Sequence, residues 1–161
     1  MTATISIIIG SDSDMNLAKK CSETLDSLSI DNTINVYSAH RTPELVAEHL
    51  KACEEGGTKV FIAMAGLAAH LAGAVASKTV KPVIGVPGDG GPLQGFDSLL
   101  STVQMPKGVP VATVAIGSAG AVNSAILAAQ IISLSSPEVE EALKKQREES
   151  VKSIEQINKN L

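Results

Sequence analysis

Five short runs of β-branched and other apolar residues alternate with segments that repeat apolar residues every three or four positions. The runs predict strands at residues 4–9, 34–37, 60–65, 83–86 and 111–116. Most are nearly continuous in apolar residues, which is typical of parallel strands covered on both faces. The run at 34–37 is the weakest and has polar neighbours, so we expect it to be an edge strand.

The segments between these runs have the spacing and end signals of helices. In the first, apolar residues three and four positions apart define one face, formed by Ala18, Cys21, Leu25 and Leu28. The second helix is predicted to open at Thr42-Pro43 and to close at Gly56-Gly57. Further helices are expected at about residues 70–78, 96–103 and 121–134. This alternation predicts an α/β fold with a doubly wound, five-stranded parallel sheet, because parallel neighbours need crossover helices.

A last helix is predicted from Ser136-Pro137 to about residue 158, and it carries two separated apolar patches. Val139 and Leu143 form the first patch, and the second is formed by Val151, Ile154, Ile157 and Leu161. A compact sheet cannot cover so long a helix. Residues 137–161 are therefore predicted to be either a frayed, solvated tail or an arm that contacts another subunit. The length of the chain predicts a single domain over residues 1–161.

Composition limits the classes of function. Apolar residues make up 44% of the chain, aromatic residues only 2%, and the formal net charge is −4. Few aromatic residues and no basic run argue against a nucleic-acid polymer as partner. No apolar stretch is long enough for a membrane span. Cys21 and Cys53 have no metal-ligand spacing and indicate a reducing compartment, and no leader precedes the first strand, so we expect a cytoplasmic protein.

Polar sequences follow the predicted strands at their carboxyl ends, where open parallel sheets bind ligands. The first strand ends in Gly10-Ser11-Asp12-Ser13-Asp14. Its hydroxyls and helix-start amides can hold a phosphate, and a carboxylate can accept hydrogen bonds from ribose hydroxyls. A plain helix cap is the alternative. An Asp-x-Asp site for Mg²⁺ is less favoured, since no carboxylate cluster follows the later strands.

Two further loops carry histidines. The second strand ends in Ser38-Ala39-His40-Arg41-Thr42-Pro43, in which histidine and arginine can serve as proton carrier and anion clamp. The alternative is a solvated loop histidine. The third strand ends in small residues, Gly66-Leu67-Ala68-Ala69, followed by His70-Leu71, which suit close approach by a ligand or simple core packing. His49 lies in the middle of a helix and is expected to be structural.

The loop at residues 87–95 is long and rich in glycine, so it is either a lid or a plain connection. Residues 104–108 could bring backbone to the same site.

Taken in order, these segments resemble the N5-carboxyaminoimidazole ribonucleotide mutase family of purine biosynthesis. The resemblance rests on Gly-Ser-Asp-Ser-Asp, Ser-Ala-His-Arg-Thr-Pro, Ala-Gly-Leu-Ala-Ala-His-Leu, Asp97-Ser98-Leu99-Leu100 and Val103-Gln104-Met105-Pro106. Two departures are Ala72, where the family usually has proline, and the glycines of residues 88–91. The branch that carboxylates aminoimidazole ribonucleotide directly with CO2 typically has lysine at the position of Arg41 and remains the alternative.

The resemblance implies a flavodoxin-like three-layer α/β/α sandwich, a homo-octamer, and a carboxylate transfer that uses no metal, ATP or organic cofactor. It implies that a phosphorylated ribonucleotide binds with its phosphate on Ser11, Ser13 and Arg41 and its ribose on Asp14. Ser38 and His40 would face the ring, and His40 would be the catalytic proton carrier. A pocket for CO2 would be lined by Gly66, His70 and Leu71.

Overall fold

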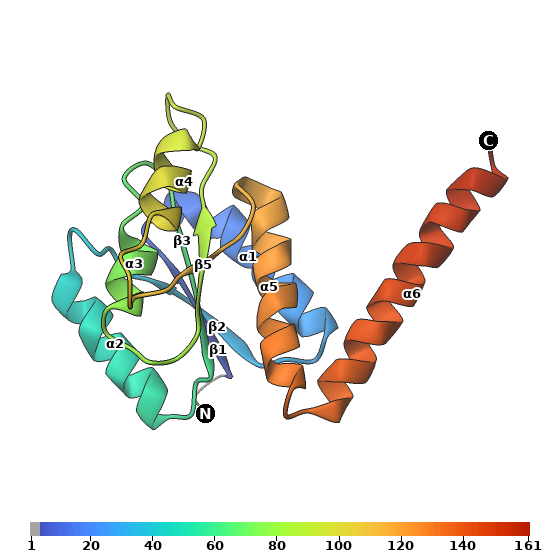
Figure 1. Cartoon of the computed structure of the whole chain (residues 1–161), viewed down its shortest axis with the longest axis horizontal. Helices are drawn as coiled ribbons and strands as arrows, with labels where there is room; N and C mark the ends of the chain where they lie inside the picture. The colour runs from blue at the N-terminus through green and yellow to red at the C-terminus, as the bar shows by residue number, and fades with distance from the viewer. Residues whose placement is uncertain (1–3) are drawn as a thin grey trace.

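The computed structural model describes residues 4–161, and the expectation for the first three residues lies outside them. The strands are β1 (Ile5–Ile9), β2 (Asn32–Val36), β3 (Val60–Ala65), β4 (Val83–Pro87) and β5 (Ala112–Thr113). All pairs are parallel, and the strand order is β2-β1-β3-β4-β5, as in flavodoxin-like folds (Figure 1). The predicted α/β class, the five-stranded sheet and the edge position of β2 are confirmed.

Helices cover both faces of the sheet. One face carries α1 (Met15–Ser27) and α5 (Gly117–Ser133), and the other carries α2 (Pro43–Glu55), α3 (Leu71–Ala76) and α4 (Phe96–Val103). Alternation along β1 decides the faces: Ile7 packs with α1 and α5, whereas Ile8 packs with α2 and α3. The core, built mainly from aliphatic side chains, is thus divided into two layers, and both cysteines are buried, free thiols within it.

Sequence predictions were wrong at three element boundaries. β2 begins at Asn32 and ends at Val36, whereas the strand was predicted at residues 34–37. β5 is only two residues long, since it pairs with β4 through Ala112 and Thr113 alone. α5 begins at Gly117 rather than at residue 121, and Gly120 lies within its first turn. A Cβ on Gly120 would lie 1.7 Å from the carbonyl oxygen of Ala115, so only glycine fits this close approach.

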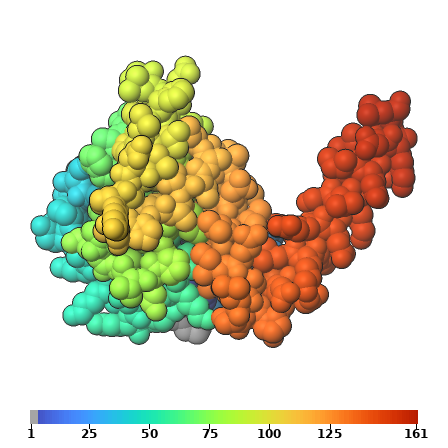
Figure 2. Space-filling view, viewed as in Figure 1, coloured from blue at the N-terminus to red at the C-terminus, as the bar shows by residue number. Residues whose placement is uncertain are grey.

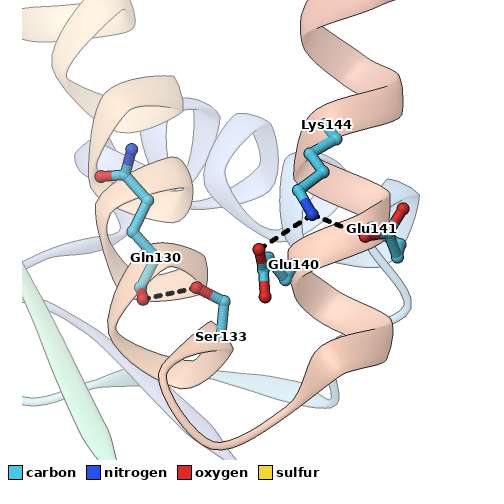
Figure 3. Close-up of polar contacts among 5 residues, drawn as sticks. All are labelled: Gln130, Ser133, Glu140, Glu141 and Lys144. Atoms are coloured by element: carbon cyan, nitrogen blue, oxygen red, sulfur yellow. Dashed lines mark hydrogen bonds and ion pairs between the residues drawn. The ribbon is translucent and has the colours of Figure 1, made fainter.

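The last helix, α6 (Pro137–Lys159), packs against α5 near its start and then extends away from the body of the molecule (Figures 1 and 2). Val139 is buried at this junction, and Lys144 lies 2.9 Å from Glu140 and 2.7 Å from Glu141 on the same helix (Figure 3). Farther along, the side chains of the second apolar patch are more than half exposed. No helix within residues 4–161 is long and apolar enough to cross a membrane.

Candidate active site

A cavity of about 860 Å³ opens where β1, β2 and β3 end. It is lined by every residue that the sequence proposed for the site: Ser11, Ser13, Asp14, Ser38, His40, Arg41, Gly66, His70 and Leu71. These residues come from three loops far apart in the sequence, and the parallel sheet brings the loops together because its strands end at the same edge. Their roles toward a ligand remain predictions.

The first loop forms a short 3-10 turn, Asp12–Asp14, before α1. The Ser11 hydroxyl accepts a hydrogen bond from the Ser13 backbone N–H at 3.4 Å and donates one to Asp12 at 3.0 Å. Ser11 therefore caps the turn, as the alternative prediction held, and also lines the cavity. Burial raises the pKa of the Asp14 carboxyl. A backbone hydrogen bond at Ser11 lowers this pKa in part, and the negative charge of Asp12 adds to the increase.

The second loop is held by its own side chains. Thr42 donates its hydroxyl to the Ser38 carbonyl at 3.1 Å, and the backbone N–H of Arg41 donates to the Ser38 hydroxyl at 3.1 Å. The Arg41 guanidinium donates through Nη2 to the carbonyl oxygen of Gly10 at 2.9 Å. This bond crosses from the second loop to the first and holds a permanent positive charge beside the serine-containing turn.

His40 and His70 meet across the cavity. Nε2 of His40 lies 2.7 Å from Nδ1 of His70, and the rings are nearly perpendicular, with centroids 4.9 Å apart. Both side chains are exposed, so the core-packing alternative for His70 is wrong. His40 is an exposed loop histidine, as the alternative prediction held, and it also has a protein partner in His70. The short contact requires one nitrogen to donate a proton and the other to accept it.

The third and fourth loops pack closely at the floor of the site. The backbone N–H of Gly88 donates to the Ala65 carbonyl at 2.8 Å, and a Cβ on Gly88 would lie 3.0 Å from the Cα of Gly66. The loop after β4 thus reaches the cavity, where Asp89 is among its lining residues. Lid movement of residues 87–95 remains a prediction.

Residues 104–108 do not line the cavity, so that prediction was wrong. Met105 instead packs against Gly73 of α3, where an added Cβ would lie 3.1 Å from the Met105 sulfur.

Sequence reasoning missed a further wall of the cavity, formed by Asn16, Leu17 and Lys20 of α1 and by Ser118 of α5. Lys20 donates through Nζ to the Ser118 hydroxyl at 2.6 Å. The four-residue spacing from Asn16 to Lys20, which places both on one face of α1, was an available signal. No such signal pointed to Ser118, because the helix that contains it was expected to begin only after this residue.

His49, on α2, lies outside the cavity and is half-buried against β1. It is hydrogen-bonded to the buried Ser6 hydroxyl at 2.9 Å and lies beside the ring of Tyr37. Burial lowers the pKa of the His49 imidazole. Among residues 4–161, no group of three or more histidine, cysteine, aspartate or glutamate side chains is arranged to hold a metal ion.

The site combines hydroxyl groups, an arginine and two paired imidazoles at the carboxyl edge of a flavodoxin-like sheet. The molecule is therefore an α/β protein whose site is suited to an anionic small molecule. The chain belongs to the AIR carboxylase family, whose sequence model matches residues 4–153.

Similar proteins align with most of this chain and with most of their own length. An N5-carboxyaminoimidazole ribonucleotide mutase from Pyrococcus abyssi is 51% identical over 90% of this chain and 82% of its own. A mutase of the same name from Pseudomonas aeruginosa is 48% identical over 96% of this chain and 94% of its own. The crystal structure of PurE from Treponema denticola has a TM-score of 0.89 at 31% identity, covering 98% of this chain and 97% of that one.

Proposed function

We propose that this chain acts as an N5-carboxyaminoimidazole ribonucleotide mutase of purine biosynthesis. The observation that carries the proposal is the meeting of His40, His70 and Arg41 in one cavity, in a chain about half identical to mutases of that name. The enzyme moves a carboxylate from the exocyclic nitrogen of the aminoimidazole ring to its C4 carbon.

The nucleotide is positioned by the first two loops. Ser11, Ser13 and Arg41 bind the phosphate, since hydroxyl donors and a guanidinium fixed on Gly10 suit a phosphate group. Asp14 accepts hydrogen bonds from the ribose hydroxyls. Its half-buried place beside the turn supports this role.

His40 carries the proton. The bond between the exocyclic nitrogen and the carboxylate carbon breaks, its electron pair stays on the nitrogen, and His40 protonates that nitrogen as CO2 forms. C4 then attacks CO2, and His40 removes the proton from C4 as the ring regains its aromaticity. Ser38 faces the ring and helps to orient it. A histidine suits both transfers because an imidazole gives and takes protons near neutral pH.

CO2 must stay beside the ring between the two steps. The pocket for it lies at Gly66, His70 and Leu71, and a Cβ at Gly66 would meet open space, so the glycine leaves this part of the cavity unfilled. Confinement keeps the reactants close and replaces a bimolecular encounter by an intramolecular one.

We also propose that the enzyme works in the cytoplasm as a homo-oligomer, with an octamer as the expected assembly. The exposed apolar patch of α6, which has no cover within the described chain, supports subunit contact through this helix.

The test supplies purified protein with the carboxyamino nucleotide, or separately with aminoimidazole ribonucleotide and bicarbonate, and follows the C4-carboxylated product by ultraviolet absorbance. Fast conversion of the first substrate, with the second requiring high bicarbonate, is the expected result. Preference for the second would make the chain a direct carboxylase instead.

His40→Asn tests the proton carrier in the same assay. Turnover is expected to fall about 100-fold or more, while nucleotide affinity stays close to that of the unchanged protein. Activity near the original level would remove His40 from this role.

A further inference from the structure

Lys20 is the cavity residue with a positive charge that the proposed mechanism leaves unused. It lies on α1, four residues after Asn16 and three after Leu17, and all of them line the cavity. Its side chain crosses from α1 to α5, the helix that lies beside α1 on the same face of the sheet (Figure 1). The contact with Ser118 fixes the ammonium at the cavity wall.

The Lys20 ammonium forms no ion pair with a carboxylate of the described residues. Its hydrogen-bond partner is a neutral hydroxyl. Ser118 stands in the first turn of α5, where the helix dipole presents its positive end. A positive charge at that position is disfavoured by the helix dipole unless nearby anions offset it.

Other charged groups face the same wall. The Asp89 carboxylate lies against Gly117 at the start of α5, where it offsets part of the positive field. Asp14 and Arg41 line the cavity from the first and second loops. Asp89 forms no ion pair with Lys20, so the ammonium keeps its charge available to a ligand.

We propose that Lys20, positioned by Ser118, binds an oxyanion of the nucleotide substrate and so helps to determine substrate specificity. The oxyanion is the phosphate or the carboxylate, both of which present charged oxygens to an ammonium group. This inference rests on the proposed function, because a nucleotide carrying both groups is the ligand considered.

The test compares Lys20→Met with Lys19→Met, a matched change of the neighbouring exposed lysine that does not line the cavity. Calorimetry measures binding of aminoimidazole ribonucleotide, of the C4-carboxylated nucleotide, and of the corresponding carboxylated nucleoside without phosphate. Lys20→Met is expected to weaken nucleotide binding about tenfold or more, and Lys19→Met to leave it unchanged. Lys20→Arg keeps the charge and should restore most of the affinity.

The ligands distinguish the two oxyanions. Loss for both nucleotides but not for the nucleoside assigns the phosphate, whereas loss for the two carboxylated ligands alone assigns the carboxylate. If the oxyanion is the phosphate, KM should rise more than kcat falls, because that contact lies away from the reacting atoms. If it is the carboxylate, which is the transferred group, kcat should fall as well. Equal affinities of the two methionine variants for every ligand would overturn the proposal.

Inorganic phosphate separates this inference from the proposed function. If thermal protection by phosphate depends on Lys20 but the protein converts neither nucleotide, the mutase proposal fails while an oxyanion site at Lys20 stands. If turnover is normal and both methionine variants match the unchanged protein, the mutase proposal stands and Lys20 has no such role.

Discussion

Nε2 of His40 and Nδ1 of His70 lie 2.7 Å apart, although the two histidines follow different strands and are 30 positions apart in sequence. In a bond this short, the state of one ring limits the state of the other: when one bonded nitrogen carries the proton, the facing nitrogen must present its lone pair. His70 therefore holds the orientation of the proposed proton carrier and couples the tautomer of His40 to its own.

Removing this contact should impair the chemical step more than binding. We expect His70→Leu to lower kcat about 10- to 100-fold with a smaller change in KM, because His40 loses its orientation. His70→Asn retains a polar atom near the position of Nδ1 and should recover part of kcat. A pH profile of kcat that is identical in the original protein and both variants would contradict a positioning role.

Arg41→Ala tests the phosphate clamp. Affinity for the nucleotide should fall about 10- to 100-fold, because a charge-assisted contact is lost, whereas affinity for the dephosphorylated nucleoside should change little. Arg147→Ala on α6 is the matched control, since Arg147 lies outside the cavity. Equal losses for nucleotide and nucleoside would count against phosphate recognition and indicate a general disturbance of the loop anchored at Gly10.

Asp14→Asn should stabilise the ligand-free protein at neutral pH while weakening ribonucleotide binding. Burial raises the pKa of Asp14 in the folded state, so folding favours its protonated form. The associated stability is fully present below the ordinary aspartate pKa and is lost as pH rises through the raised value. The gain from asparagine should therefore be largest at neutral pH and shrink as pH falls through that window.

Thermal unfolding of Asp14→Asn between pH 4 and pH 8 checks this dependence, with Asp31→Asn as a control because Asp31 is exposed and outside the cavity. A difference in unfolding temperature that stays constant across the range would show that burial of the charge is not its cause.

The exposed patch of α6 predicts an assembly that depends on this helix. Ile154→Asp combined with Ile157→Asp should lower the mass measured by light scattering and leave the rest of the fold intact, because both side chains are more than half exposed in the single chain. Lys152→Glu on the same helix is the control. Deletion of the residues after Ser136 should have a similar effect on mass, and an unchanged mass in both variants would rule out the arm.

Local sequence accounts for most of the secondary structure. The apolar runs determined β1, β3 and β4 closely, and Thr42-Pro43 marked the start of α2, because strand burial and helix entry leave signals within a few neighbouring residues. The start of α5 left no such signal. Gly120 is required by contact with Ala115, and packing of this kind is invisible when glycine is interpreted by its helix propensity alone.

The sequence by itself determined the fold class and the loops that form the site, since parallel strands place their carboxyl ends at one edge. Only the tertiary structure decided which atoms meet there: the imidazole contact of His40 with His70, the anchoring of Arg41 on Gly10, and the crossing of Lys20 to Ser118. Each of these contacts joins separate elements across the fold. Their distances depend on sheet twist and helix packing, which no local pattern of residues specifies.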